Sequence, residues 1–276
     1  MTRSEPPIDR ERTMKRLTLF AHYDGAGEVK RYVLFHLSAL RAVSNEVWFI
    51  SSATLSADEL GKARKVCERA WTRENVGYDF GMWKEALARI DVTEWDEIVL
   101  TNSSVFGPLW PLDEVFARAP VHADFWGMTE NPEVTLHLQS YFLVFRARLL
   151  RSAAFANFWN GVAALRDKRR IIETYEVGLT RTFSEAGFLG EPWVSMAGLP
   201  GRSPLVRFRR PHLENPTIVQ PAALLERGMP YVKIELLRDN PAKVRLGPVR
   251  RAMERAGFDP SLVEIEPRPR ERPSDS

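Results

Sequence analysis

The chain has 276 residues, of which 44% are hydrophobic and 27% are charged, and its formal net charge at pH 7 is +3. This length and composition fit a globular protein with a sizeable core, built as one large domain or as one domain with an appendage. Acidic and basic residues nearly balance and form no single basic stripe, which argues against a nucleic-acid-binding function.

Strands and helices are predicted to alternate along the chain. Short apolar runs predict strands at 16–21, 46–51, 70–72, 96–101, 123–128 and 140–145. Helical spacing of apolar residues predicts helices that begin near Val29, Ser56, Phe80 and Pro111, and two more around 153–166 and 171–186. This alternation predicts right-handed βαβ units and an α/β fold, with a Rossmann-type, mostly parallel central sheet flanked by helices.

The domain organisation follows from where this pattern begins and weakens. We expect a disordered leader at 1–14, an α/β domain at 15–190, an irregular C-terminal extension at 191–265 that packs on it, and a disordered tail at 266–276. Within the extension, YVKIELL (231–237) is apolar enough to form a strand or a helix that packs back on the domain.

The single cysteine, Cys67, excludes a disulfide within the chain and favours a reducing cytoplasm. Its spacing from Leu60, Ala63 and Ala70 predicts a core side chain on an apolar helix face. No apolar run reaches the ~20 residues of a membrane-spanning helix, and the N-terminal sequence lacks the apolar region of a signal peptide. The predicted location is the cytoplasm, free or at the inner face of the membrane.

Basic residues gather toward the C-terminal part of the chain. They either form a solvated surface or contact phosphate groups, of a nucleotide or of an anionic membrane. They are Arg207, Arg209, Arg210, Arg250, Arg251, Arg268, Arg270 and Arg272.

Polar residues follow four of the predicted strands. In an open α/β sheet, ligands bind beyond the carboxyl ends of the strands, so these residues define one candidate cleft. They are His22, Tyr23 and Asp24; Ser51 and Ser52; Arg73, Glu74 and Asn75; and Asn102, Ser103 and Ser104.

The stretch TRENVGYDFGMWKEAL (72–87) combines a turn with a helix start. Gly77 and Gly81 leave room for close backbone approach, and the helix N-terminus offers N–H groups to an anion. Asp79 can accept a hydrogen bond from a sugar hydroxyl; alternatively, Asn75 or Asp79 caps the helix. The spacing fits neither a Walker A loop nor a Gly-x-Gly-x-x-Gly dinucleotide motif.

The strand end Asn102-Ser103-Ser104 lies where nucleotide-sugar enzymes of the two-layer α/β type often carry Asp-x-Asp. Those carboxylates bind Mg²⁺ or Mn²⁺, which bridges the diphosphate leaving group. Here Asn102 and Ser104 offer only uncharged oxygens, which predicts a weak metal site. The alternative is that Ser103 and Ser104 satisfy backbone groups of the turn.

Three further residues are candidates for the acceptor side. His137 and Gln139 precede an apolar strand and are placed to face an acceptor sugar, although a lone histidine is commonly structural. Glu176 flanks a buried helix face and is a candidate general base, the alternative being a solvated helix glutamate. Neither a zinc-ligand spacing nor a Gly-x-Ser-x-Gly elbow occurs in the sequence.

Six blocks of the sequence, in order, resemble the rhamnan synthesis protein F family. They are RENVGYDFGMWKEAL, LTNSSVFGPL, ADFWGMTE, HLQSYFLVF, YEVGLT and GMPYVKIELLRDNP. The resemblance spans about residues 16–242. It implies a GT-A-like fold and a glycosyltransferase that uses a nucleotide-activated sugar, dTDP-rhamnose, to build rhamnose-containing cell-surface polysaccharide or lipopolysaccharide.

The resemblance also assigns residues. A strong block contains Asn75, Gly77, Tyr78, Asp79 and Gly81. Asn102 and Ser104 match a block that other members often show as Asn-Asp-Ser, so Ser103 stands in place of their carboxylate and metal dependence is weakened. Glu176 matches the helix position where inverting GT-A enzymes place their base.

These expectations combine into one mechanism. Glu176 and Asp79 are the catalytic candidates, and Glu176 deprotonates the acceptor hydroxyl in an inverting transfer. His137 and Gln139 bind the saccharide or lipid-linked acceptor. The donor is held by His22, Asp24, Ser52, Arg73, Asn75, Gly77, Tyr78, Gly81, Asn102, Ser103 and Ser104, with at most a weak Mg²⁺ or Mn²⁺ at Asn102 and Ser104.

Two other functions remain open from the sequence. The missing carboxylate at Ser103 fits a non-catalytic sugar-nucleotide- or polysaccharide-binding partner in a synthase complex. A Rossmann methyltransferase fits less well, because HYDGAGEVK (22–30) after the first strand lacks the expected glycine-rich turn.

Overall fold

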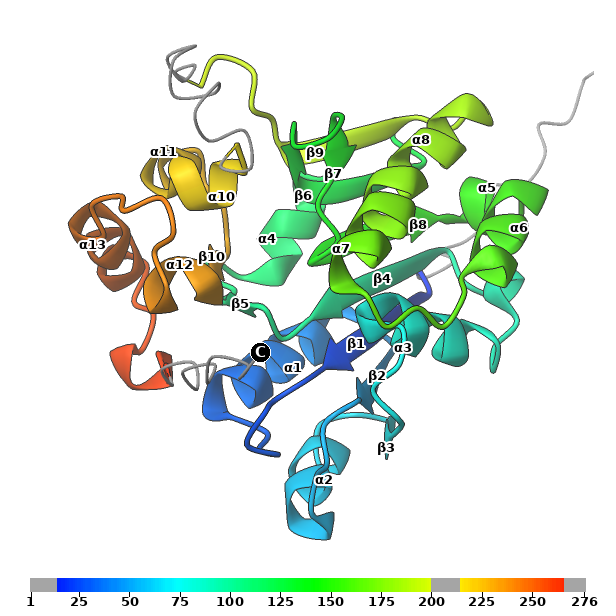
Figure 1. The fold of residues 1–276 in the computed structure, drawn as a ribbon, viewed down its shortest axis with the longest axis horizontal. Coiled ribbons are helices and arrows are strands. Elements are labelled where there is room, and N and C mark those ends of the chain that lie inside the picture. Colours follow the sequence, from blue (N-terminus) through cyan, green and yellow to red (C-terminus); the bar gives the residue numbers. More distant parts are fainter. Residues whose placement is uncertain (1–13, 200–213, 266–276) are drawn as a thin grey trace, which may run out of the picture.

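The computed structural model describes residues 14–199 and 214–265. The predicted tail and nearly all of the predicted leader therefore lie outside the described residues. Within them, an eight-stranded sheet forms the centre of the fold (Figure 1). Its strands are β1 (Arg16–His22), β2 (Glu46–Ser51), β3 (Arg69–Thr72), β4 (Glu97–Asn102), β6 (Phe125–Asn131), β7 (His137–Leu138), β8 (Phe142–Arg146) and β9 (Gly190–Val194).

The strand order is β3-β2-β1-β4-β8-β6-β7, with β9 beside β6. Strands β3, β2, β1 and β4 are mutually parallel, whereas β8 runs antiparallel to both β4 and β6. The predicted α/β class with a mostly parallel central sheet is therefore confirmed. A separate two-stranded sheet pairs β5 (Val105–Phe106) with β10 (Val232–Lys233).

Helices cover both faces of the sheet. The longer ones are α1 (Arg31–Val43), α2 (Ala57–Arg64), α3 (Tyr78–Leu87), α6 (Ala153–Gly161), α8 (Val177–Glu185) and α13 (Gly247–Arg255). The shorter ones are η1 (Val92–Glu94), α4 (Leu112–Ala117), α5 (Ala147–Leu150), α7 (Lys168–Ile171), the π-helical η2 (Ile172–Glu176), α10 (Pro216–Val219), α11 (Pro221–Glu226), α12 (Ile234–Arg238) and η3 (Pro260–Leu262).

Two apolar cores lie on opposite sides of the sheet, because side chains alternate along a strand. In β1, Leu17 and Leu19 join one core with α3, α6 and α8, and Phe20 joins the other with α1 and the C-terminal helices. Figure 1 shows α10–α13 gathered beside α1 and α4, away from α3, α5, α6 and α8. The apolar runs that predicted β1, β2, β4, β6 and β8 are thus buried on both faces, whereas β3 at the sheet edge is partly exposed.

Local details both support and correct the sequence predictions. The Ser56 hydroxyl accepts the Glu59 N–H at 3.1 Å and caps α2, which begins where the sequence predicted. The Glu59 carboxylate binds the Val29 N–H at 2.7 Å instead of returning to the cap. Cys67 is buried, as expected for a core side chain, but α2 ends at Arg64, so the predicted helix through Cys67 was too long.

The C-terminal extension is built into the fold. Strand β9 joins the central sheet beside β6, and α10–α13 share one apolar core with α1. The segment predicted as a strand or a helix contains both, β10 followed directly by α12. Among the described residues, no helix has the length and hydropathy needed to cross a membrane.

Candidate active site

The carboxyl ends of the central strands meet at one edge of the sheet. The parallel register pairs His22 with Ser51 and Ala21 with Asn102, so the polar residues after β1, β2 and β4 are neighbours. The Ser103 N–H donates to the Ala21 carbonyl at 3.1 Å, which fixes the turn that leaves β4. The structure therefore brings these predicted strand-end residues together.

The antiparallel strand β8 adds residues to this edge that were not predicted by the rule that ligands bind beyond the carboxyl ends of the strands. Because Thr101 pairs with Phe142, the two residues before β8, Ser140 and Tyr141, lie beside the end of β4. The Thr101 hydroxyl donates to the Tyr141 carbonyl at 2.8 Å. The rule considers residues that follow parallel strands, so it overlooks residues that precede an antiparallel one.

Asp79 and Asn102 form the centre of this site. The Asn102 side-chain amide donates to Asp79 Oδ2 at 2.8 Å. Asn102 Oδ1 in turn accepts the Ser104 hydroxyl at 2.6 Å and the Ser104 N–H at 3.1 Å. Helix α3 has Gly77 at its N-cap position, without a side-chain cap. The helix-cap alternative for Asn75 and Asp79 is thus wrong, and a carboxylate from α3 reaches the end of β4.

The loop before α3 is shaped by its glycines. Gly77 has φ of +80° and donates its N–H to the Leu165 carbonyl at 3.0 Å. A Cβ on Gly81 would collide with the Val76 carbonyl. Tyr78 also has a positive φ of 49°, a strained conformation for a residue with a side chain. The glycines therefore hold a tight turn that aims Asp79 at β4.

Arg73 supports this loop from inside. Its Nε donates to Glu85 at 2.8 Å, and its Nη1 donates to the Val76 carbonyl at 2.8 Å. Asn75 is exposed in the same loop. The structure thus places Arg73, expected at the donor, in an ion pair that shapes the loop.

His22 and Ser51 form a buried pair beneath the site. His22 Nδ1 lies 2.9 Å from the Ser51 hydroxyl, and burial lowers the pKa of His22 to about 4. The neighbouring Ser52 is also buried, and its hydroxyl has no hydrogen-bond partner among the described residues. Buried hydroxyl groups of this kind are commonly satisfied by an ordered water molecule or by a bound ligand.

The loop after β1 forms one wall. The Asp24 carboxylate accepts the N–H groups of Ala26 and Glu28, and it lies 3.9 Å from the Lys30 ammonium. Asp24 therefore orders a turn. The Tyr23 N–H approaches the Ser103 hydroxyl at 3.3 Å, which joins this loop to the end of β4.

Glu176 lies at the same edge of the sheet. Its Oε1 accepts the Ser140 N–H at 2.8 Å, and Ser140 lies beside the end of β4. Among the described residues, Oε2 of Glu176 has no hydrogen-bond partner. Glu176 ends the π-helical turn η2, and π-turns inside helices are frequent at functional sites. The Ser140 N–H thus fixes the orientation of the partly buried Glu176 carboxylate.

His137 and Gln139 lie in a buried polar layer. Nδ1 of His137 is 2.8 Å from the Thr135 carbonyl, and the side-chain oxygen of Gln139 accepts the Thr129 hydroxyl at 2.8 Å. Both residues are only 2% exposed. The Thr129 hydroxyl also lies 3.1 Å from that of Tyr141, so this layer supports the residues at the end of β4.

The electrostatic surroundings of Tyr141 connect it to Glu176. Burial raises the pKa of the Tyr141 hydroxyl, with a smaller contribution of the same sign from the Glu176 carboxylate. Tyr141 is therefore neutral at physiological pH and lies within electrostatic range of Glu176.

The protein oxygens around Asp79, Asn102 and Ser104, here called the corner, do not by themselves enclose a divalent cation. Asp79 supplies one carboxylate, and Asn102 Oδ1 already accepts two hydrogen bonds from Ser104. Mg²⁺ and Mn²⁺ favour several hard oxygen ligands, carboxylates above all. Within the described part of the chain, no group of three or more His, Cys, Asp and Glu side chains is arranged to hold a metal ion.

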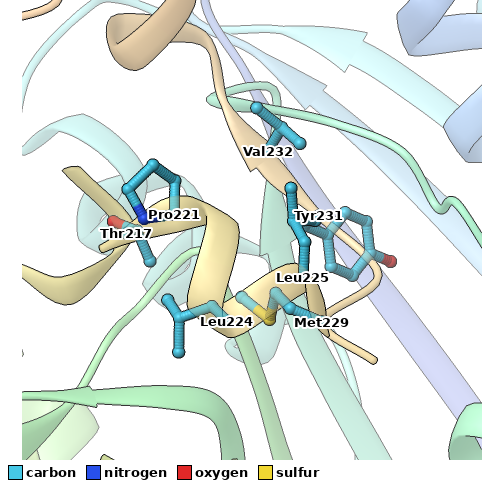
Figure 2. A pocket seen from close by; sticks show the side chains of 7 residues that line it. All are labelled: Thr217, Pro221, Leu224, Leu225, Met229, Tyr231 and Val232. Carbon is cyan, nitrogen blue, oxygen red and sulfur yellow. The ribbon is translucent and has the colours of Figure 1, made fainter. Parts of the chain in front are cut away.

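A small cavity elsewhere is too small for a sugar nucleotide. It lies between α11 and the Tyr231–Val232 segment and has a volume of about 10 Å³. Figure 2 shows the Tyr231 hydroxyl pointing away from the apolar side chains of α11. This volume is at most that of one water molecule, so we interpret the cavity as a packing defect.

Comparisons with known proteins add a family match. The model of a family described as rhamnan synthesis protein F matches residues 47–259. The chain is 28% identical over 202 residues to virulence protein VirA of Vibrio anguillarum, covering 64% of each chain. It is 25% identical over 149 residues to the uncharacterized protein y4gN of Sinorhizobium fredii, covering 51% of this chain and 39% of y4gN.

Two solved structures are similar at low identity. The glycosyltransferase GlyE of Streptococcus pneumoniae TIGR4 aligns with a TM-score of 0.43 and 12% identity, over 91% of this chain and 62% of GlyE. A cytidylyltransferase from Leptospira borgpetersenii aligns with a TM-score of 0.37 and 13% identity, over 65% of this chain and 76% of that protein.

Proposed function

Because the chain belongs to the rhamnan synthesis protein F family, we propose that it is a GT-A-like glycosyltransferase that uses a nucleotide-activated sugar. We further propose dTDP-rhamnose as the donor and a growing cell-surface polysaccharide or lipopolysaccharide as the acceptor. One observation carries the proposal: Asp79, hydrogen-bonded to Asn102, and Glu176, anchored on Ser140, lie at the same sheet edge.

The donor binds between the loop after β1 and the turn after β4. Ser52 offers a buried hydroxyl without a partner among the described residues, and Ser103 and Ser104 offer hydroxyl groups at the turn. Asp79 accepts a hydrogen bond from a sugar hydroxyl. His22 and Arg73, which the sequence assigned to donor contact, act here by holding the strand ends and the loop.

Glu176 is the general base of the reaction. Its anchored oxygen fixes the orientation of the carboxylate, and Oε2 takes the proton of the acceptor hydroxyl. The acceptor oxygen then bonds to the anomeric carbon, while the bond from that carbon to the phosphate oxygen breaks. The electron pair leaves with the nucleoside diphosphate, and attack opposite the leaving group inverts the configuration.

We propose a mechanism without a step through a metal ion, because Asp79 brings one carboxylate to Asn102 in place of an Asp-x-Asp pair. Hydrogen bonds to the departing diphosphate come from polar groups of the turn after β4. Such pre-arranged donors stabilise charge that develops in the transition state. His137 and Gln139 are assigned a supporting role beneath the acceptor, since both are buried.

We place the protein in the cytoplasm, at the inner face of the membrane. The exposed side chains of Arg250, Arg251 and Arg255 on α13 support this location. Each such cation contributes about 1 kcal/mol near an anionic lipid surface. The other basic residues noted in the sequence, at 207–210 and 268–272, lie outside the described residues.

A donor panel tests the enzyme proposal. The full chain is incubated with dTDP-rhamnose and with UDP- and GDP-sugars, each with a lipid-linked or oligosaccharide acceptor, and nucleoside diphosphate release is measured. Acceptor-dependent release supports a transferase. Donor binding by calorimetry without release, with Mg²⁺ or with a chelator, would instead favour a non-catalytic sugar-nucleotide-binding partner, which the uncharged Ser103 motivates.

A further inference from the structure

The C-terminal extension delivers a lysine to the end of β4. Strand β10 pairs antiparallel with β5, and this register places Lys233 opposite Val105. The next residue, Ile234, donates its N–H to the Ser104 carbonyl at 3.0 Å. The backbone of Lys233 is thus held beside the turn that carries Asn102 and Ser104, although more than a hundred residues separate them in sequence.

The side chain of Lys233 lies on the ring of Tyr141. Its Nζ is 4.7 Å from the ring centroid, within the range of a cation–π interaction. Tyr141 is buried between Ser140, which anchors Glu176, and Phe142, which pairs with Thr101. The Lys233 ammonium therefore lies against Tyr141, next in the chain to Ser140, which anchors the proposed base.

The proposed reaction would be favoured by a positive charge near the turn after β4. A sugar nucleotide carries a diphosphate that gains negative charge as it departs, and lysine binds phosphate as a point charge. The protein oxygens of the corner do not by themselves enclose a divalent cation, and Arg73 is held by Glu85 beneath the glycine loop. The partly buried Lys233 side chain, packed on the Tyr141 ring, brings a cationic group to this part of the fold.

We propose that Lys233 binds the terminal phosphate of the nucleoside diphosphate, where it stabilises the leaving group in place of a metal ion. The inference rests on the proposed function, because it deepens the same donor site. Lys233 belongs to the segment that the sequence predicted only to pack back on the domain. Its packing against β5 is what brings the ammonium group to the site.

Calorimetry with nucleotides isolates this contact. The full chain is titrated with dTDP and dTMP, UDP and UMP, and GDP and GMP, in the presence of a chelator. Loss of one charged hydrogen bond predicts that Lys233→Met weakens diphosphate binding about ten- to a hundredfold. Monophosphate affinity is expected to change less than about threefold, and Lys233→Arg to recover most of the diphosphate affinity.

A matched control removes the same charge far from the site. Lys65→Met, at the exposed end of α2, is expected to leave both affinities unchanged. Thermal melts of each variant confirm folding. If Lys233→Met keeps the preference for diphosphate over monophosphate, or loses both affinities equally, Lys233 does not contact the terminal phosphate.

The outcomes separate this inference from the proposed function. If Lys233→Met retains transfer activity and an unchanged preference for diphosphate, Lys233 does not bind the terminal phosphate, and the transferase proposal is unaffected. If diphosphate binding depends on Lys233 but no sugar is transferred, the transferase proposal is contradicted and the Lys233 contact is supported. If the wild-type chain binds none of the diphosphates, both the Lys233 contact and the transferase proposal are contradicted. In an active enzyme, Lys233→Met should lower kcat, because the contact strengthens as the diphosphate departs.

Discussion

The carboxylate of Asp79 accepts a hydrogen bond from the side-chain amide of Asn102 at 2.8 Å. This contact joins the start of α3 to the carboxyl end of β4, where the sequence shows uncharged residues in place of an Asp-x-Asp motif. A carboxylate is thus supplied to the strand end by a neighbouring helix. The arrangement makes Asn102 the bridge between Asp79 and the Ser104 turn.

The Asp79–Asn102 contact predicts energetic coupling between the two residues. In a double-mutant cycle with Asp79→Ala and Asn102→Ala, we expect a coupling of about 1–3 kcal/mol in the free energy of unfolding, typical of a charged hydrogen bond. Urea unfolding measures it. The control is Asp91→Ala, which removes the hydrogen bond to Thr93 near the other end of β4. Its change in the free energy of unfolding should add to that of Asn102→Ala. Additivity of the Asp79 and Asn102 changes would contradict the coupling.

Glu176→Gln tests the proposed base. Glutamine can keep the bond from the Ser140 N–H but cannot take a proton, so kcat should fall about 10²–10⁴-fold. Steady-state kinetics and calorimetry check that donor affinity stays within about twofold, since the donor does not depend on this charge. The exposed Glu173, one helical turn earlier, provides the control Glu173→Gln, which should keep full activity. Normal turnover in Glu176→Gln would remove Glu176 from the mechanism.

Two glycine-to-alanine changes within helices, Gly81→Ala in α3 and Gly61→Ala in α2, are expected to change the free energy of unfolding in opposite directions. Gly81→Ala should destabilise the protein by about 1–3 kcal/mol, because the added methyl group meets the Val76 carbonyl. Gly61→Ala in α2 meets open space and should stabilise by about 0.5–1 kcal/mol through helix propensity. Denaturant midpoints measure both. Equal effects of the two changes would show that the loop relaxes around the new side chain.

Two buried histidines predict acid sensitivity. Burial lowers the pKa of His22 to about 4 and that of His36 to about 3, from an ordinary 6.5. The unfolded chain therefore binds protons at a higher pH than the folded one, so this stability is complete above pH 6.5 and is lost as pH falls toward 4. At about pH 5 each histidine costs about 2 kcal/mol relative to neutral pH.

Histidine variants measure this pH dependence. Urea unfolding at about pH 7.5 and pH 5 should show a difference that shrinks by roughly half in His36→Phe, a change that keeps the edge contact with Phe20. His122→Gln changes an exposed histidine and should retain the full difference. An unchanged difference in His36→Phe would mean that His36 does not govern the acid response.

Local sequence patterns predicted the sheet well and the contacts of the site poorly. The apolar runs located β1, β2 and β4 within a residue or two, because burial on both faces leaves a continuous apolar signal. The Asp79–Asn102 contact depends on the direction in which α3 leaves its glycine turn, which spacing does not encode. The sequence offered both as candidates, but as separate ones.

The same limit explains the residues that changed role or were missed. Arg73 was expected at the donor, and its ion pair with Glu85 on α3 could not be predicted from the sequence. Tyr141 was overlooked because it precedes an antiparallel strand. Lys233 was overlooked because only the pairing of β10 with β5 brings it to β4. Each of these depends on tertiary pairing between distant segments.

Acceptor-dependent release of nucleoside diphosphate is the decisive assay for the proposed glycosyl transfer. The full chain, with an oligosaccharide or lipid-linked acceptor, is compared with Glu176→Gln and with a reaction that lacks acceptor, across dTDP-, UDP- and GDP-sugars. We predict that the wild-type chain releases dTDP from dTDP-rhamnose only when acceptor is present, and that Glu176→Gln binds the donor without releasing dTDP. Donor binding by the wild-type chain without release from any sugar nucleotide would contradict the account.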